Sequence, residues 1–282
     1  MQRSLEAGSD KTQLIPLKMI SNHQIDYAIH GEEMQYVEIE LDPTETAIAE
    51  SGAFMMMEDG IEMQTIFGDG SKPQQGFLGK LMSAGKRLLT GESLFMTAFT
   101  NVGQGKKKVS FASPYPGKII TLDLLRMGGK MVCQKDSFLC AAKGVAVGIE
   151  FQRKLGTGLF GGEGFIMQKL EGDGLAFVHA GGHVTEKELL PGELLKVDTG
   201  CIVAFSQTVN YDIQFVGGIK NTIFGGEGLF FATLRGPGKV WIQTLPISRL
   251  AGRILAYATY KRKEEGSILG GIGNVLDGDG WK

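Results

Sequence analysis

Apolar positions alternate with polar ones in many short segments of this chain. Clear examples are residues 25–29 and 35–41, where apolar side chains occupy every second position. Such a period of two is typical of β-strands that bury one face of a sheet. Segments of this kind recur as far as residue 245, and turns such as Pro116-Gly117 and Pro191-Gly192 separate them. The sequence therefore predicts a mainly β protein.

Helical spacing of apolar residues is confined to two segments. Residues 68–89 combine Phe77, Leu78, Leu81 and Met82 with basic residues in the pattern of a short amphipathic helix. After Pro246, residues 247–255 have helical spacing again, Ser248 is a suitable N-cap, and a small-residue-rich apolar segment follows at 267–276. We expect a helical insertion and a helical C-terminal tail.

A glycine-rich turn occurs in three copies. Residues 160–165 read Phe-Gly-Gly-Glu-Gly-Phe, residues 224–229 read Phe-Gly-Gly-Glu-Gly-Leu, and residues 90–95 read Thr-Gly-Glu-Ser-Leu-Phe. Glycine suits places where the backbone turns sharply or two backbones approach closely. We therefore predict a tight turn before a strand in each copy. The structural turn residues are Gly91, Glu92, Gly161, Gly162, Glu163, Gly164, Gly225, Gly226, Glu227 and Gly228.

Other landmarks keep a constant distance from these turns. Glu163 follows Glu150 by 13 residues, Glu227 follows Gln214 by 13, and the first copy has 17 additional residues within 68–89. A glycine follows the turn glutamate by 11 residues in every copy. An acidic residue and a small residue precede an apolar strand in each copy, at Glu50-Ser51, Asp136-Ser137 and Asp198-Thr199. Three copies in register indicate an internal repeat.

The spacing divides the chain into modules. We predict a polar leader at 1–22, a first β module at 23–117 with the insertion 68–89, a second at 118–181, a third at 182–245, and a helical and Gly-rich tail at 246–282. If the modules surround a pseudo-threefold axis, Glu92, Glu163 and Glu227 occupy equivalent places. Turn amides are the usual partners of such carboxylates, and a shared cation site is the alternative.

Composition narrows the class of protein. The 282 residues are enough for a full core, and 42 glycines with only 8 prolines, without a period of three, exclude collagen and disordered low-complexity chains. The formal net charge of −2 gives no global reason to expect a nucleic-acid or membrane partner, and Lys106-Lys107-Lys108 fits a solvated turn. Without a signal peptide's apolar centre or an apolar run of about 20 residues, a cytoplasmic location is expected.

Candidate chemistry is sparse. Cys133, Cys140 and Cys201 lie in apolar segments and fit buried thiols, and the four histidines show no metal-ligand spacing. The Gly-Gly-Glu-Gly turns lack the Lys-Ser/Thr pair of phosphate-binding loops. The methionine run 55–57 fits adaptable core filling, with a soft-metal or promiscuous binding surface as the alternative. The sequence identifies no catalytic residue, no metal site and no cofactor.

The combined motifs resemble a known family. Residues 50–56, 59–63 and 90–95, the two Gly-Gly-Glu-Gly turns and residues 248–251 are similar to the altered inheritance of mitochondria protein 24 family, over about 23–260. The resemblance implies modules similar to the tryptophan RNA-binding attenuator protein (TRAP-like) fold, a double-stranded β-helix-like arrangement. It also implies a link of the mitochondrial branch to inner-membrane organisation, and the family has no established catalytic residues.

Three function classes follow. The first is a non-enzymatic oligomeric scaffold or binding protein, with possible action at a membrane surface. The second is an RNA or small-ligand binder of attenuator-like fold, for which the chain lacks an exposed pattern of lysines and aromatic residues. The third is a cupin-like enzyme, which needs a histidine cluster. We expect a homo-oligomer, with a trimer favoured, through the insertion or the tail. We expect no DNA partner, and RNA is a disfavoured partner.

Overall fold

The computed structural model describes residues 23–50, 52–67, 95–153, 165–215, 230–255 and 257. These residues form nineteen strands, two short 3-10 turns (Lys135–Ser137 and Thr199–Cys201) and one helix at 247–255. All strand pairings are antiparallel. The prediction of a mainly β protein is confirmed.

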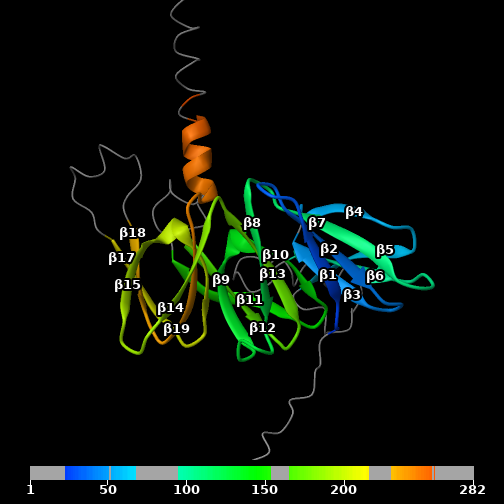
Figure 1. Ribbon diagram of the computed structural model, residues 1–282, viewed down its shortest axis with the longest axis horizontal. Coiled ribbons are helices and arrows are strands. Elements are labelled where there is room, and N and C mark those ends of the chain that lie inside the picture. Colours follow the sequence, from blue (N-terminus) through cyan, green and yellow to red (C-terminus); the bar gives the residue numbers. More distant parts are fainter. Residues whose placement is uncertain are drawn as a thin grey trace, which may run out of the picture.

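The strands belong to four sheets, which we call sheets A to D (Figure 1). Sheet A contains, in order, β1 (Asp26–His30), β2 (Tyr36–Leu41), β7 (Lys107–Ala112) and β4 (Phe54–Met57). Sheet B contains β5 (Ile61–Phe67), β6 (Phe95–Asn101), β3 (Thr46–Glu50), β10 (Phe138–Ala142), β13 (Leu175–Gly181) and β8 (Gly117–Asp123). Sheet C contains β11 (Ala146–Arg153), β12 (Phe165–Glu171), β9 (Lys130–Gln134), β16 (Ile202–Ser206), β19 (Gly238–Gln243) and β14 (Val184–Leu189). Sheet D contains β15 (Leu194–Asp198), β18 (Phe230–Arg235) and β17 (Asn210–Phe215).

One pairing pattern occurs three times along the chain, in β2–β7, β8–β13 and β14–β19, which we call units 1, 2 and 3. In each unit the sixth strand pairs with the first and the third, and the fifth strand pairs with the second and the fourth. The third strand of every unit also has a register shift at the same place, between Phe54 and Met56, Phe138 and Cys140, and Ile202 and Ala204. The shared irregularity makes the third strands structurally equivalent.

Consecutive units are joined by strand pairing. The second strand of one unit pairs with the third strand of the next, as β3 with β10 and β9 with β16. We call these two pairings the internal joints. The units follow one another along the long axis of the molecule (Figure 1). No pairing among the described strands joins unit 3 back to unit 1, so the pseudo-threefold arrangement is not confirmed.

Three hydrophobic cores lie between the stacked sheets. Val37, Ile39 and Phe111 of sheet A pack against Ala49 and Phe177 of sheet B in the first core. The second core lies between sheets B and C, and the third between sheets C and D. Every residue of β10 is buried, because sheet B has a neighbouring sheet on each face. Burial of aliphatic and aromatic side chains at about 1.5–3 kcal/mol each is the main stabilising contribution of this stack.

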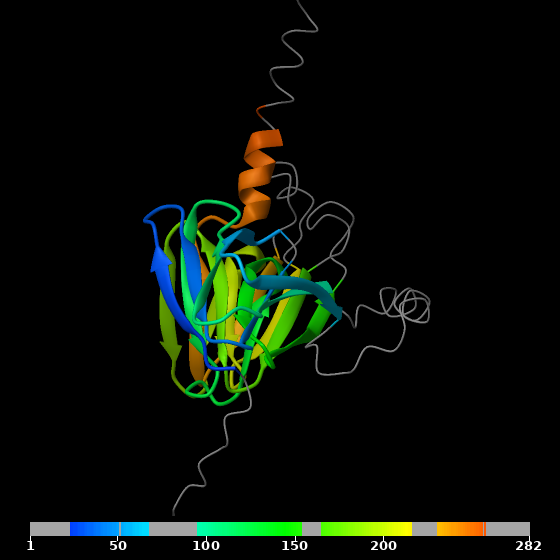
Figure 2. The same ribbon diagram turned by 90° about the vertical axis from the view of Figure 1, so that its right-hand side faces the viewer.

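The tail helix begins one residue earlier than its predicted N-cap. Residue 247 is already helical, and the carbonyl of Pro246 accepts the amides of Arg249 and Leu250 at 3.0 and 3.2 Å. The expectation that Ser248 is the N-cap is therefore wrong, because Pro246 occupies that position. Figure 2 shows the helix standing away from the sheets. The insertion 68–89 and the leader 1–22 lie outside the described residues.

Candidate functional site

The repeated turns lie outside the described residues. This applies to all ten predicted turn residues, Gly91, Glu92, Gly161, Gly162, Glu163, Gly164, Gly225, Gly226, Glu227 and Gly228. Their special backbone conformations, and the shared site of the three glutamates, therefore stay predictions. The neighbouring strands are described, and they place other residues at equivalent positions.

The last residue of the second strand is polar in every unit: Glu50, Gln134 and Asp198. Glu50 and Asp198 belong to the predicted acidic-small pairs, whereas Asp136 is two positions past its structural equivalent. The sequence alignment of Asp136 with Glu50 and Asp198 was wrong, because Asp136 lies inside the short turn Lys135–Ser137, whereas Asp198 precedes the equivalent turn Thr199–Cys201. These three residues lie where one unit passes from its second to its third strand.

Glu50 lies half-buried at the first internal joint. Burial and the negative charge of Asp136 raise the pKa of Glu50 to about 7, and the nearby Lys135 opposes this effect. Asp198 has a different environment: its carboxylate accepts the amide of Gly200 at 2.9 Å and lies 3.3 Å from the Arg249 guanidinium. Equivalent positions thus hold a protonatable carboxyl group at one joint and an exposed ion pair at the end of the molecule.

A small pocket lies beside Gln134. Its volume is about 10 Å³, and it is lined by Tyr115, Gln134, Asp136, Gln243, Pro246, Ile247 and Ser248. Gln243 accepts the amide of Gly181 at 2.7 Å and donates to the carbonyl of Gly200 at 2.9 Å, which links units 2 and 3. The space suits about one water molecule, far less than the several hundred Å³ of ordinary ligand pockets.

Among the described residues, the four histidines lie in separate environments. His179 is 1 % exposed, its ring lies edge-on to Tyr115 with centroids 4.4 Å apart, and neither ring nitrogen has a hydrogen-bond partner. Burial lowers the pKa of His179 to about 4. His23 accepts the amide of Thr46 at 2.9 Å, and His30 stacks on Tyr36. Within the described ranges, no three His, Cys, Asp or Glu side chains are placed to hold a metal ion.

The three cysteines differ in how far they are buried. Cys133 and Cys140 are fully buried, in the second and first cores respectively, and burial raises the pKa of both thiols. Cys201 is partly buried, and burial raises its pKa as well. A protonated buried thiol is a poor nucleophile.

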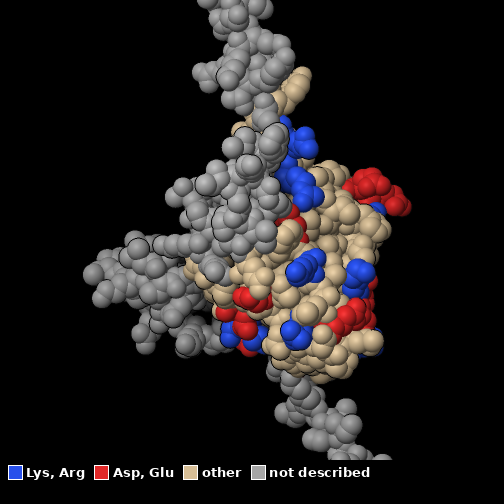
Figure 3. Space-filling model, turned by 90° about the vertical axis from the view of Figure 1, so that its left-hand side faces the viewer, with Lys and Arg blue, Asp and Glu red and all other residues tan. Residues whose placement is uncertain are grey.

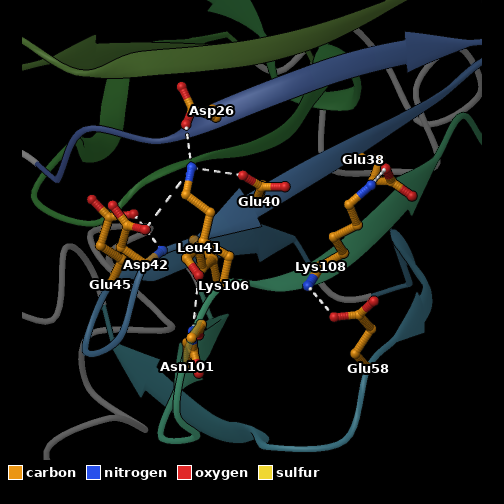
Figure 4. Close-up of polar contacts among 11 residues, drawn as sticks. Asp26, Glu38, Glu40, Leu41, Asp42, Glu45, Glu58, Asn101, Lys106 and Lys108 are labelled. Carbon is orange, nitrogen blue, oxygen red and sulfur yellow. Dashed lines mark hydrogen bonds and ion pairs between the residues drawn. The ribbon is translucent and has the colours of Figure 1, made fainter.

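The lysines 106–108 were expected in a turn, but Lys107 and Lys108 already belong to β7, so only Lys106 lies in the loop before that strand. Carboxylates of sheet A pair with two of these lysines. The Lys106 ammonium lies 2.7 Å from Glu40 and 3.1 Å from Asp26, and Lys108 lies 2.7 Å from Glu38 (Figure 4). Hydrogen bonds to these carboxylates raise the pKa of both lysines. At the unit 3 end of the molecule, Figure 3 shows basic and acidic residues interspersed on a mostly uncharged surface. Neither surface resembles the basic stripe of a nucleic-acid-binding protein.

The third strand of unit 1 is exposed, whereas the third strands of units 2 and 3 are buried. The third strands of units 2 and 3, β10 and β16, pair on both sides and are almost wholly buried. The third strand of unit 1, β4, pairs only with β7 in the described part of the chain. Its side chains Phe54, Met55, Met56 and Met57 are 40, 48, 44 and 39 % exposed. The expectation that the methionine run fills the core is wrong, because no described strand covers that edge.

At the unit 3 end of the molecule, no described strand pairs with the outer edge of the second strand, β15. The second strands of units 1 and 2, β3 and β9, pair on both sides, whereas β15 pairs only with β18 among the described strands. Leu194 is 51 % exposed, and Lys196 is exposed as well. The edges of β4 and β15 lie at opposite ends of the long axis (Figure 1). The one sequence signal for this edge is Lys196, which stands where the equivalent strands have the buried Ile48 and Val132.

The comparisons agree with this architecture. The model of the family described as "Mitochondrial biogenesis AIM24" matches residues 27–245. The chain belongs to this family. An uncharacterized protein of Streptococcus pyogenes serotype M6 is 31 % identical over 244 residues, which is 85 % of this chain and 93 % of the relative. A crystal structure of a Streptococcus pyogenes protein matches with a TM-score of 0.66 and 25 % identity, over 83 % of this chain and all of the other.

Membership of the AIM24 family confirms the resemblance seen in the sequence. The matched range begins within β1 and ends just after β19, so it covers all three units. In the portion of the molecule that is described, no helix has the length and apolar character needed to cross a membrane.

Proposed function

We propose that this AIM24-family protein is a non-enzymatic scaffold or binding protein that acts as a homo-oligomer. The observation that carries this proposal is the edge of β4, where four apolar side chains are 39–48 % exposed at a position that is buried in the other two units. Exposed, unpaired and apolar strand edges associate with other chains unless something covers them. Aromatic residues and methionine are also enriched at protein interfaces.

The energetics favour a covered edge. Full burial of one such side chain contributes about 1.5–3 kcal/mol, and these four are already roughly half-covered. Completing their burial adds several kcal/mol in total at that rate. Phe54 is already oriented by stacking on Phe99, with ring centroids 5.4 Å apart, so its contact surface is ordered before binding.

The arrangement of ionisable groups supports a non-enzymatic role. Glu50 and His179 have strongly shifted pKa values, but each shift is caused mainly by burial. His179 lies edge-on to Tyr115, which lines the pocket beside Gln134, and that pocket holds about one water molecule. Catalysis needs a nucleophile or base, a partner and room for a substrate, and beside these described residues the pocket offers room for water only.

Light scattering of the full-length chain at micromolar concentration tests the proposal. We expect a mass that is a multiple of the chain mass of 30.4 kDa, and the multiple tests the favoured trimer. Met57→Lys should lower that mass, because it places a charge on the β4 edge. Leu125→Lys is the matched control: Leu125 is 39 % exposed, like Met57, but lies in a turn rather than on a strand edge, so a lysine there should leave the mass unchanged. A monodisperse monomer of the unmodified chain refutes the proposal.

The tail helix supports the membrane version of this role. Ile254, Leu255 and Tyr257 are 60, 67 and 71 % exposed, and Arg253 lies beside them. Exposed apolar residues next to arginine suit the surface of an anionic bilayer. Cosedimentation with anionic vesicles should decrease in Ile254→Ser/Leu255→Ser relative to the unmodified chain. Retention of pooled RNA in the same assay would instead favour the RNA-binding alternative.

A further inference from the structure

We infer that the β15 edge of one copy pairs antiparallel with the β4 edge of a second copy. This inference rests on the proposed function, because it names the partner of the exposed β4 edge. The evidence is the continuity of the fold. Within the chain, each second strand that has a following unit pairs with the third strand of that unit. Only β15 and β4, among the described second and third strands, have that side unpaired.

The resulting sheet would repeat the order of the internal ones. In both sheet B and sheet C, the strand order begins with the fourth, fifth and second strands of one unit. The third, sixth and first strands of the next unit follow in that order. Sheet D contains the fourth, fifth and second strands of unit 3, and sheet A contains the third, sixth and first strands of unit 1, followed by β1. Sheets D and A of two copies are therefore the two halves of one more such sheet.

The internal joints also specify the register. In both, the fourth residue of the second strand lies opposite the third residue of the third strand: Ala49 opposite Cys140, and Cys133 opposite Ala204. The same rule places Val197 opposite Met56. One step along, Ile48 pairs with Ala141 and Val132 with Phe205, which places Lys196 opposite Met57.

Strands that take part in an internal joint are buried, whereas the two strands left without a described partner on that side, β4 and β15, are mostly exposed. The pairing strands β10, β16, β3 and β9 are nearly all buried, whereas every residue of β4 is exposed and β15 has a single buried residue, Val197. A second copy would supply the missing partner to both edges. The contact joins two different edges, β15 of one copy and β4 of the next, and is therefore heterologous. It forms a closed ring when the rotation between successive copies returns the last copy to the first.

Lys196 is the position at which this joint differs from the internal ones. Its equivalents Ile48 and Val132 are buried apolar residues. A lysine on an edge strand disfavours indiscriminate pairing. Opposite Met57, however, its aliphatic stem can pack on the thioether while the ammonium remains in water. We therefore expect Lys196→Val to strengthen association, and Lys196→Glu, whose shorter stem covers less of Met57, to weaken it.

Cysteine cross-linking between copies tests the register. One full-length preparation carries Met57→Cys and another carries Lys196→Cys, both with Cys201→Ser, since Cys133 and Cys140 are buried. Directly opposite residues of antiparallel strands have the Cα separation that a disulfide needs. After mixing and mild oxidation, we expect a disulfide-linked dimer in the mixture and none in either preparation alone. Met56→Cys mixed with Lys196→Cys is the slip control, because a shift of one residue points the side chains to opposite faces.

The outcomes separate this inference from the proposed function. At least tenfold more cross-linked dimer in the mixture than in the slip control supports the register. An oligomer by light scattering with equal cross-linking in both mixtures overturns the inference and leaves the proposed function standing. A monomer overturns both. A monomer in which the Met57→Cys thiol resists alkylation shows in addition that the chain's own insertion or tail covers β4.

Discussion

Replacement of Glu50 by glutamine should change how stability depends on pH. The carboxyl group of Glu50 is half-buried at the first internal joint, beside Asp136, and its pKa is raised from about 4.5 to about 7. Between these values the folded protein binds more protons than the unfolded chain. The free energy of unfolding therefore falls as pH rises through this window. At about 1.4 kcal/mol per pH unit, the loss reaches about 3 kcal/mol above pH 7.

Glutamine removes this dependence without changing the shape of the side chain. Unit 2 already has a glutamine at the equivalent position, Gln134, which is 6 % exposed. We expect Glu50→Gln to match the unmodified protein near pH 4.5 and to be more stable by about 2–3 kcal/mol at pH 8. The variant and the unmodified protein must be compared at the same pH, because His179 also changes the free energy of unfolding with pH. Its lowered pKa makes that free energy rise as pH increases from about 4 to 6.5, in both proteins alike.

Urea unfolding at pH 4.5, 6 and 8 measures the effect, with the midpoint and slope fitted at each pH. Asp198→Asn is the matched control, since Asp198 is the equivalent residue at an exposed end of the molecule. A difference between Glu50→Gln and the unmodified protein that stays constant from pH 4.5 to pH 8 would refute the reasoning. It would show that the pKa of the Glu50 carboxyl group is the same in the folded protein as in the unfolded chain.

Three further predictions concern the sheets. His179→Phe should reduce the loss of stability on acidification from pH 6.5 to 4, because the unfolded chain binds the imidazole proton of His179 before the folded protein does, while His23, whose pKa is also lowered, keeps its own contribution; urea unfolding at pH 5 and 7 checks this. Gly117→Ala should destabilise by about 1–3 kcal/mol, since a methyl group there meets the backbone of Ala180; thermal unfolding should show a lower midpoint. Phe177→Ala should cost about 3–5 kcal/mol in urea unfolding, because Phe177 is fully buried between sheets A and B, and a cost below 1 kcal/mol would contradict that packing.

The sequence by itself determined the class of fold and the positions of many strands. Alternation at 25–29 and 35–41 predicted strands that the structure places at Asp26–His30 and Tyr36–Leu41. In Tyr36–Leu41 the prediction succeeds because one face of the strand is buried, which leaves a local pattern with a period of two, whereas the residues of Asp26–His30 are mostly exposed. The motifs at 50–56, 59–63 and 90–95, the two Gly-Gly-Glu-Gly turns and residues 248–251 together also identified the AIM24 family, whose model matches residues 27–245. Each motif is weak, and the combination is specific.

Only the tertiary structure decided which strands are covered. Residues 54–57, 138–142 and 202–205 are all apolar and occupy equivalent places in their units, yet the first segment is exposed and the other two are buried. Their local sequences do not carry this difference, because burial depends on whether a preceding unit supplies a second strand to pair with. The same dependence explains why Glu50 and Asp198, equivalent in sequence, differ in environment. Pairing between units is a long-range property, and it determines both the protonation of Glu50 and the two edges at the ends of the molecule.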